Sequence, residues 1–328
     1  MAAERRGRPA PTGRADPSRI RPLPGGGGLR VVANPAATGA ERALAELRSL
    51  LPRARPVTVR SPGGLPAALE AAARSAAEAG GALGVVGGDG SVNAAARAAL
   101  RHGLPLAVFP GGALDHFAAA AGLRSVSVAA TAVEEGRGAA VDVALIGTPG
   151  AHRPPRVFLN TFALGAYADL VRFRELVRPR CGRRAATALA LPFASGTARP
   201  FALRLDGTPR RLWLLFAGNG VYRQHSLHAL PTRERLSDGL LDVRLLDVRL
   251  LDADAGQRHG RLVALPAEAV DAPHALALPE QHVVPRLRLA GLRGLTYAYD
   301  GEAAAAPDTL TLTAAPAALL LYRPVPSK

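Results

Sequence analysis

The 328-residue sequence is poor in cysteine, in lysine and in long apolar runs, and the shortages of cysteine and of apolar runs each exclude a class of protein. Cys181 is the only cysteine, so the chain can build no internal disulfide and no thiolate metal site, which is typical of a reducing cytoplasm. No apolar run approaches the ~20 residues that a transmembrane helix needs. The first 28 residues are rich in Arg, Pro and Gly and lack the apolar stretch of a signal peptide. We therefore expect a cytoplasmic protein whose only contact with a membrane is peripheral, at the inner face.

The charge of the chain is strongly unbalanced. Its formal net charge is +15, and Lys328 is the only lysine, so arginine carries nearly all of the positive charge. One explanation is a compositional bias, and the other is attraction to an anionic membrane surface. The densest arginine cluster comprises Arg172, Arg174, Arg178, Arg180, Arg183 and Arg184. Nucleic acid is not an expected partner, because aromatic residues make up only 4% of the chain and no recognition motif is present.

The most informative segment is the glycine-rich stretch at residues 87–93, Gly-Gly-Asp-Gly-Ser-Val-Asn. An apolar run precedes it and an alanine-rich stretch follows, which predicts a strand, a turn and a helix. Glycines reach positive φ and let the backbone approach an anion, and a helix start offers free N–H groups. Asp89 would repel phosphate, so we expect Mg²⁺ or a substrate hydroxyl beside it. The segment therefore predicts phosphoryl transfer.

Strands and helices alternate in the first half of the chain, after a tail at residues 1–28 that its composition predicts to be disordered. The predicted strands lie at residues 29–33, 57–59, 83–86 and 105–109. This order predicts a parallel α/β sheet, with helices on both faces, over residues 29–139. Three glycine-bearing loops follow strands, so they lie at the carboxyl ends, where ligands bind in such sheets.

From about residue 141 the pattern changes to strands with one helical stretch, at about 168–191. The predicted strands lie at residues 141–146, 157–161, 201–205, 211–217, 241–251 and 286–289. Asp206 and Gly207 fit a hairpin turn. The tandem repeat Leu-Leu-Asp-Val-Arg at 240–249 has an odd length, so a strand through it needs a bulge or a longer loop to keep equivalent side chains on the same face. We expect a mainly antiparallel β-sandwich over residues 140–306, with residues 307–328 packing back onto the first domain.

Several motifs in order resemble the bacterial diacylglycerol kinase-like lipid kinases, which share a catalytic domain with sphingosine and ceramide kinases. These motifs are Asn34-Pro35, residues 87–93, residues 110–118 (Pro-Gly-Gly-Ala-Leu-Asp-His-Phe-Ala), residues 160–167, Gly218-Asn219, residues 237–243 and residues 300–302 (Asp-Gly-Glu). Gly-Gly-Asp-Gly alone also occurs in NAD kinases and phosphofructokinases, whereas the ordered set is more specific. The resemblance covers about residues 29–324. It implies a phosphofructokinase-like domain that binds ATP and a β-sandwich that contributes the lipid site.

The resemblance also implies site residues. The nucleotide contacts would come from Asn34, Pro35, Thr38, Gly39, Gly87, Gly88, Asp89, Gly90, Ser91, Asn93, Gly112 and Ala113. A structural Mg²⁺ would be held by the backbone carbonyls of Arg235 and Leu240 and by the carboxylate of Asp238, oxygen ligands that suit this ion. Without the resemblance, Asp238 and Gly239 would be interpreted as an ordinary turn.

Glu302 matches the proton acceptor proposed for the family, and Asp300 lies two residues before it. A carboxylate can take the proton of an alcohol that attacks the γ-phosphoryl group of ATP. In an extended segment the two side chains would point to the same side and could divide base and metal duties. The alternative is a hairpin turn at Asp300 and Gly301, with Glu302 solvated. Asp89 is a rival base, but we favour Glu302 for this role and assign to Asp89 the orientation of the hydroxyl or of nucleotide-bound Mg²⁺.

Two residues depart from the family pattern, because Ala113 replaces a common Thr and Asp115 a common Asn. A carboxylate that faced the triphosphate would weaken ATP binding unless Mg²⁺ or arginine offset its charge. The departures motivate one alternative, an impaired kinase that binds lipid or nucleotide without turnover. A second alternative, an NAD kinase-like enzyme with a soluble substrate, is disfavoured by the segments around Asp238 and Glu302.

The whole sequence predicts an ATP- and Mg²⁺-dependent kinase that phosphorylates a lipid alcohol. Diacylglycerol, which would give phosphatidate, is the default substrate. Sphingoid bases, other glycerolipids and polyprenol-like alcohols stay open as substrates, and so does a homodimer as the assembly.

Overall fold

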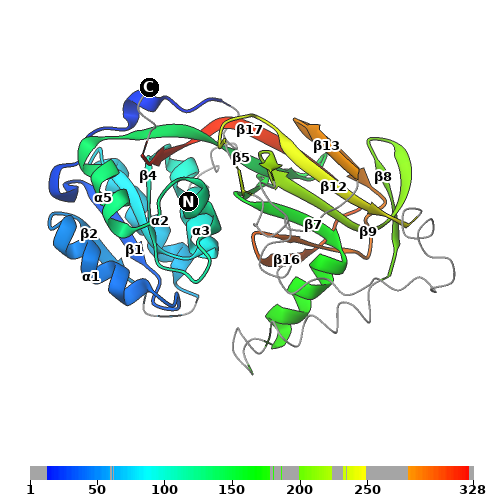
Figure 1. The fold of residues 1–328 in the computed structure, drawn as a ribbon, viewed down its shortest axis with the longest axis horizontal. Helices are drawn as coiled ribbons and strands as arrows, with labels where there is room; N and C mark the ends of the chain where they lie inside the picture. Colours follow the sequence, from blue (N-terminus) through cyan, green and yellow to red (C-terminus); the bar gives the residue numbers. More distant parts are fainter. Residues whose placement is uncertain are drawn as a thin grey trace, which may run out of the picture. The chain divides into compact units, whose positions relative to one another are not determined.

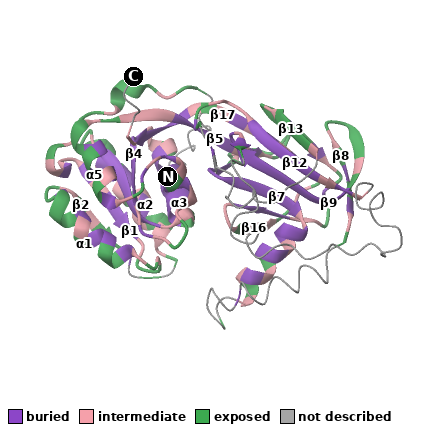
Figure 2. Cartoon of the chain, viewed as in Figure 1, coloured by how far each residue is buried: buried purple, intermediate pink, exposed green. Residues whose placement is uncertain are grey.

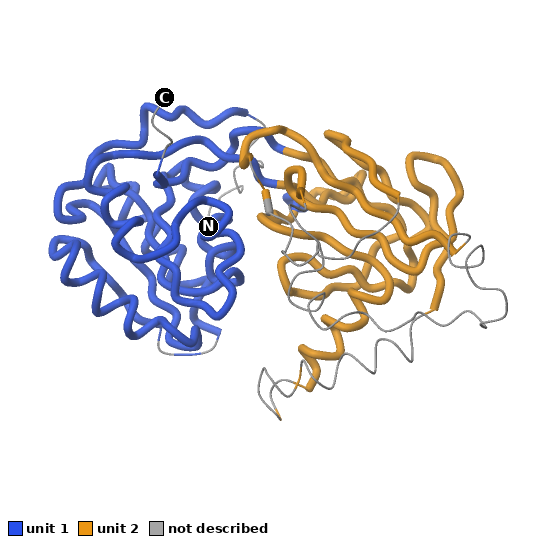
Figure 3. The backbone as a smooth tube through the Cα atoms, viewed as in Figure 1, with its two compact units in different colours: residues 1–143, 153–155, 315–328 blue, residues 144–152, 156–314 orange. Residues whose placement is uncertain are grey.

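The computed structural model of the chain describes residues 13–59, 61, 63–177, 180, 186, 199–223, 232, 233, 235–248 and 280–324. Two compact units divide the chain (Figure 3). Residues 1–143, 153–155 and 315–328 form the first unit, and residues 144–152 and 156–314 form the second. No helix in the described ranges is long and apolar enough to cross a membrane.

The first unit contains a parallel sheet covered by helices (Figure 1). Its parallel strands are β1 (Leu29–Ala33), β2 (Arg55–Thr58), β3 (Ala82–Gly87) and β4 (Leu106–Pro110). The spatial order is β2-β1-β3-β4, and Leu321 near the end of β17 (Thr309–Tyr322) pairs in parallel with Leu106 of β4. All six residues of β3 are buried, as expected for a parallel strand with helices on both faces. The labelled strands β1 and β4 are also mainly buried and are drawn largely in purple (Figure 2).

Five helices belong to this unit: α1 (Ala40–Leu50), α2 (Leu65–Glu78), α3 (Asp89–His102), α4 (His116–Ala120) and α5 (Val126–Glu135). Helix α1 packs with α5 and α2 packs with α3, and right-handed crossovers place the two pairs on opposite faces of the sheet. Helix α3 ends at Gly103 and α5 at Gly136, both in the left-handed conformation that glycine adopts without strain. The predicted parallel α/β sheet with helices on both faces is thus confirmed.

Residues 13–28, which we expected to be disordered, instead pack on the first unit. They form two short 3-10 helices, η1 (Pro17–Arg19) and η2 (Pro24–Gly26). The N–H of Ala15 donates to the carbonyl of Ala317 at 2.8 Å, and the hydroxyl of Tyr322 donates to the carbonyl of Arg21 at 2.8 Å. The composition argument failed because it counts apolar side chains and misses such backbone hydrogen bonds. The rest of the predicted tail lies outside the described residues.

The second unit is mainly antiparallel, as predicted. Its strands are β6 (Arg156–Phe158), β7 (Thr161–Gly165), β8 (Phe201–Leu205), β9 (Thr208–Asn219), β10 (Tyr222–Arg223), β11 (Thr232–Arg233), β12 (Leu241–Asp247), β13 (Glu280–Val284), β14 (Arg286–Ala290), β15 (Thr296–Tyr299) and β16 (Glu302–Ala305). The main spatial order is β16-β15-β7-β9-β8-β14-β17, and β12 pairs with β9 and β13. Strands β5 (Gly138–Gly147) and β17 contribute residues to both units.

A helical stretch at residues 166–177 interrupts these strands. The predicted helix at 168–191 is therefore described only in its first part, and nearly all of its remainder lies outside the described residues. Both local predictions about turns and bulges hold. Asp206 and Gly207 have φ values of 48° and 89°, as a type I′ hairpin turn requires. The register of β12 against β9 shifts between Leu246 and Asp247, inside the tandem repeat.

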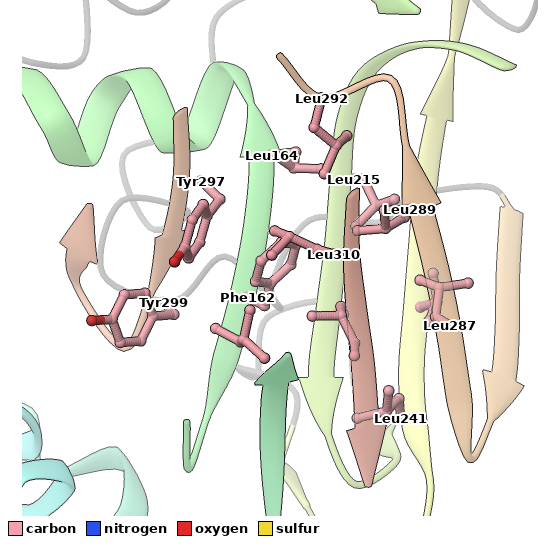
Figure 4. Packing of buried hydrophobic residues seen from close by; sticks show 14 of the residues in the cluster. Phe162, Leu164, Leu215, Leu241, Leu287, Leu289, Leu292, Tyr297, Tyr299 and Leu310 are labelled. Carbon is pink, nitrogen blue, oxygen red and sulfur yellow. The ribbon is translucent and has the colours of Figure 1, made fainter. Parts of the chain in front are cut away.

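The core of the second unit is an apolar cluster contributed by most of its strands (Figure 4). Phe162 of β7 stacks on Tyr297 of β15, with ring centroids 5.5 Å apart. Tyr297 in turn stacks on Tyr299, at 5.8 Å. Such aromatic pairs contribute about 0.5–1.5 kcal/mol beyond their buried area. The packing therefore fixes the strand that leads to residues 300–302.

The buried carboxylate of Asp142 binds the irregular backbone of β17 at Ala317. Ala317 has a φ of 51°, and its N–H donates to Oδ1 of Asp142, which is 3% exposed, at 2.6 Å. Asp142→Ala should lower the free energy of unfolding by about 1–3 kcal/mol, because it removes the acceptor of this N–H group. Urea unfolding measures the change, with Asp308→Ala at an exposed position as the control. Equal stability of the two variants would contradict this role of Asp142.

Candidate functional site

Three loops meet at the carboxyl ends of β1, β3 and β4. The Nδ2 atom of Asn34 donates to Oγ of Ser91 at 2.8 Å, and Asn34 Oδ1 accepts the N–H of Ala36 at 3.1 Å. The N–H of Gly39 donates to the carbonyl of Gly111 at 2.9 Å. The segments that the sequence assigns to the nucleotide are therefore adjacent in the first unit. Pro35, Thr38 and Ala113 are exposed.

The glycines of these loops are needed for the room that a missing Cβ leaves, and not for a positive φ. We expected positive φ in residues 87–93, but the positive-φ glycines of the chain do not include Gly87, Gly88 or Gly90. A Cβ on Gly112 would lie 2.5 Å from the Cα of Gly88, and one on Gly87 would lie 2.8 Å from the Ser91 side chain. A Cβ on Gly90 would meet nothing within 4 Å. Gly88 and Gly112 therefore permit close contact between two loops, whereas Gly90 faces open space.

Helix α3 begins earlier than the sequence indicated, at Asp89 rather than Ala94. Residues 89–93 are thus its first turns, and the positive end of the helix dipole lies at the glycine segment. Ser91 and Asn93 are 5% and 2% exposed, so their side chains are buried within the unit. Their position favours support of the loops over direct contact with a ligand.

The Asp89 carboxylate is bound to the start of helix α4. Its Oδ2 accepts the N–H of His116 at 3.1 Å, and its Oδ1 accepts the N–H of Phe117 at 2.9 Å. A carboxylate whose two oxygens accept backbone N–H groups is held in place by them. This geometry accounts for an aspartate in the glycine segment without a metal, and it disfavours Asp89 as the base.

Asp115 is the acidic residue at the family's usual asparagine position. Both of its oxygens accept the N–H of Gly112, at 3.0 and 3.1 Å, and its φ is 48°. Burial raises the pKa of Asp115, the Gly112 N–H opposes this shift, and the charge of Asp89 adds to it. The fold therefore holds this carboxylate in a place that penalises its ionisation.

Two glycine substitutions should separate support from binding. Gly112→Ala should lower the free energy of unfolding by about 1–3 kcal/mol, because its Cβ would collide with backbone. Gly90→Ala should leave stability unchanged or raise it by up to about 1 kcal/mol, because alanine favours helix. It should nevertheless weaken binding of Mg²⁺-ATP, measured by calorimetry. Unchanged ATP affinity in Gly90→Ala would contradict a nucleotide at this face.

Asp115→Asn should stabilise the protein in a pH-dependent way. A raised pKa in the folded state means that Asp115 contributes stability only at low pH and loses this contribution as pH rises through the folded pKa. Asparagine is neutral and also tolerates positive φ. The gain in Tm should therefore be larger at pH 7 than at pH 4. An equal gain at both pH values would show that ionisation of Asp115 is not the cause.

In the second unit, Asp300 forms a hairpin turn between β15 and β16. Asp300 and Gly301 have φ values of 43° and 84°. The extended segment that would align Asp300 with Glu302 is therefore wrong, and the hairpin alternative is right. The Asp300 carboxylate accepts three backbone N–H groups, from Leu159 at 2.6 Å and from Asn160 and Thr161 at 2.9 Å each. These bonds interrupt the predicted strand 157–161, which becomes β6 and β7, and they favour an anchoring role over a catalytic one.

Glu302 follows this turn and is exposed. The Tyr299 hydroxyl donates to Glu302 Oε2 at 2.7 Å and accepts from Nη1 of Arg156 at 2.8 Å. Arg174, which is 8% exposed, donates from Nη2 to the carbonyl of Gly301 at 3.3 Å. Sequence reasoning missed Tyr299 and Arg156 because neither belongs to a motif and 143 residues separate them.

The predicted Mg²⁺ ligands surround Gly220, which has a φ of 84°. A Cβ there would lie 3.4 Å from the carbonyl oxygen of Arg235 and 3.5 Å from Oδ2 of Asp238. The N–H of Gly220 donates to the carbonyl of Leu240 at 2.9 Å. Asp238 also accepts the N–H groups of Val221 and Leu240, at 3.0 and 3.1 Å. Carbonyl oxygens and one carboxylate around a space that a Cβ would fill are a donor set that fits Mg²⁺. The described residues contain no group of three His, Cys, Asp or Glu side chains that could hold a metal.

A buried arginine joins two motif segments of the second unit. Arg233 donates from Nη1 to the carbonyls of Leu159 and Asn219, at 2.8 and 2.7 Å, and from Nη2 to Oδ1 of Asn160 at 3.1 Å. Its guanidinium also lies 5.5 Å from the ring centroid of Tyr222. The motifs at 160–167 and 218–219 thus share one polar centre, which lies beside the backbone that Asp300 anchors.

Comparisons with known proteins find one matching family model and several solved structures of similar fold. Residues 28–146 match the family model of the diacylglycerol kinase catalytic domain. A solved structure of a proposed diacylglycerol kinase from Bacillus anthracis str. Sterne aligns with a TM-score of 0.62 and 17% identity, over 90% of this chain and 97% of that one. A structure of a diacylglycerol kinase from the same organism aligns with a TM-score of 0.59 and 17% identity, over 90% and 96%. These structures establish a shared fold. No curated protein sequence matches the chain.

Proposed function

We propose that this chain, whose residues 28–146 match the family model of the diacylglycerol kinase catalytic domain, is an ATP- and Mg²⁺-dependent lipid kinase. The observation that carries the proposal is the meeting of three loops at the carboxyl ends of β1, β3 and β4. Hydrogen bonds from Asn34 and Gly39 and the close approach of Gly88 to Gly112 hold these loops together. The start of α3 adds backbone N–H groups and a positive dipole end, which favour the phosphates of a nucleotide.

The proposed chemistry assigns the proton to Glu302. Of the three carboxylates considered for the base, Asp89 and Asp300 have both oxygens bound to backbone N–H groups, and each therefore has a structural task. Glu302 is exposed at the end of a hairpin and is a suitable acceptor for an alcohol proton. Mg²⁺, when bound, would neutralise negative charge, and Arg235, Asp238 and Leu240 would hold a structural ion of this kind. Diacylglycerol is the proposed substrate, with phosphatidate as the product.

Contact with an anionic membrane also stays part of the proposal. Of the arginine cluster named from the sequence, Arg172 and Arg180 are exposed. Arg174 is buried against the turn at Gly301 and serves the fold instead. Arg178, Arg183 and Arg184 lie outside the described residues. The exposed arginines favour peripheral attraction to anionic headgroups.

Transfer of labelled phosphate from γ-labelled ATP to lipid tests the proposal directly. Diacylglycerol, a sphingoid base, a polyprenol and NAD are offered separately, and the products are separated by thin-layer chromatography. Label in phosphatidate supports the proposal, and label in NADP supports the soluble-substrate alternative. Bound ATP with no labelled product supports the impaired kinase that Ala113 and Asp115 suggest, especially if changing them to Thr and Asn produces activity.

Two variants distinguish the base from the anchor. Glu302→Gln should lower kcat by about 10²–10⁴-fold, the usual contribution of a positioned base, with little change in the unfolding free energy. Asp300→Asn should lower the unfolding free energy by about 1.5–3 kcal/mol, because an amide cannot accept all three N–H groups. Kinetics and urea unfolding of both variants measure these effects. Near-normal turnover in Glu302→Gln would overturn the assignment.

A further inference from the structure

A chain of hydrogen bonds leads to Glu302 from strands β6 and β15 of the second unit. Arg156 lies in β6, Tyr299 ends β15 and Glu302 begins β16. Arg156 Nη1 lies 2.8 Å from Tyr299 Oη, which lies 2.7 Å from Glu302 Oε2. The Arg156 guanidinium also lies 5.7 Å from the centroid of the Tyr299 ring.

The direction of both bonds follows from the donor groups. A guanidinium only donates, so the Tyr299 oxygen is the acceptor from Arg156. The one hydroxyl proton of Tyr299 is then directed to Glu302, whose carboxylate accepts. Burial first, and then the hydrogen bond and charge of Glu302, raise the pKa of Tyr299. The phenol therefore keeps its proton and acts as a donor throughout the physiological pH range.

Tyr299 is held rigidly by its surroundings, whereas Glu302 is exposed and would be mobile without the bond from Tyr299. The Tyr299 residue is 2% exposed, and its ring stacks on that of Tyr297. Figure 4 shows both side chains on β15. An exposed glutamate samples many rotamers, and ordering it costs conformational entropy. A bond from a fixed phenol removes part of this freedom, so the carboxylate already has a defined place before substrate binds.

We propose that Tyr299, backed by Arg156, is a positioning residue for Glu302 in the lipid kinase reaction. This inference rests on the proposed function. In the reaction, the lipid hydroxyl oxygen forms a bond to the γ-phosphorus, and its proton passes to Glu302. The bond between the γ-phosphorus and the bridging oxygen breaks, and its electron pair leaves with ADP. Tyr299 does not exchange its proton, and it acts only through the placement of the carboxylate.

The charges around Glu302 agree with this role. Arg156 lies on β6, and Arg174, on the helix 166–177, contacts the turn through the Gly301 carbonyl. The Asp300 carboxylate is bound to the backbone of residues 159–161. Burial raises the pKa of Tyr297, the other phenol of β15, and the charges of Arg156 and Glu302 shift it in opposite directions. Two cations thus accompany the two carboxylates at this hairpin.

Matched tyrosine variants test the inference in the full chain. Tyr299→Phe keeps the ring and removes the hydroxyl, and it should lower kcat by about tenfold, a part of what a general base contributes, with unchanged KM for ATP and lipid. Tyr297→Phe is the control, because Tyr297 stacks on the same ring and its hydroxyl has no hydrogen-bond partner in the described part of the chain. Its kcat should equal that of the wild type. Equal kcat values in all three proteins, or equal losses in both variants, would overturn the inference.

Arg156 variants and a spectroscopic readout complete the test. Arg156→Met should lower kcat by a few-fold and Arg156→Lys should restore part of the loss, because lysine keeps a cationic donor. In [13Cζ]tyrosine NMR, Glu302→Gln should lower the pKa of Tyr299, because it removes a charge that raises it. An unchanged Tyr299 titration would overturn the hydrogen-bonded chain. If the wild type phosphorylates no lipid, the proposed function fails instead, and the titration still shows whether the chain exists.

Discussion

Aspartate carboxylates that accept backbone N–H groups hold together both parts of the candidate machinery. Asp89 binds the first residues of α4, and Asp300 binds the chain at residues 159–161. Asp115, Asp142 and Asp238 make bonds of the same kind at other irregular segments. Such segments cannot satisfy their N–H groups within a helix or sheet, and a charged acceptor satisfies several at once. The loops therefore depend on these side chains for their shape.

This constraint changes how acidic motifs are interpreted. In sequence, Asp89, Asp300 and Glu302 all resemble catalytic groups, because each lies beside glycine in a family motif. In the structure, the two aspartates are bound on both oxygens, whereas Glu302 accepts from a side chain, Tyr299. A general base must be held in position and must still be able to accept a proton. One hydrogen bond from a side chain positions the carboxylate without tying both of its oxygens to backbone N–H groups. The division of labour among the carboxylates thus follows from what each of them accepts.

Much of the fold was predictable because its signals are local. Alternating apolar runs and glycine turns predicted the parallel sheet, and Asp206 with Gly207 predicted a hairpin. The failures have long-range causes. The strand at 157–161 divides because Asp300, about 140 residues away, takes its N–H groups. Strand β16 is largely alanine, which has little preference for strands, and is fixed by pairing with β15. Helix α5 was overlooked although Ser125 caps it.

The candidate site was predictable to the same extent. The motifs identified the three loops of the first unit. They did not show that Gly88 and Gly112 are needed because the two loops approach closely, rather than because of a positive φ. The resemblance named Glu302, but Tyr299 belongs to none of its motifs, and Arg156, 143 residues before Tyr299, reaches it only through the tertiary fold. Local patterns thus identify which segments carry chemistry, and the tertiary contacts decide which atoms are left to perform it.

Hydrogen exchange with and without a non-hydrolysable Mg²⁺-ATP analogue tests the central claim, that three loops held by Asp89 and the glycine contacts form the nucleotide site. We predict slower exchange in peptides that cover residues 34–39, 87–93 and 111–117, together and at one analogue concentration. Binding of the analogue with protection elsewhere, and none in these three segments, would contradict it.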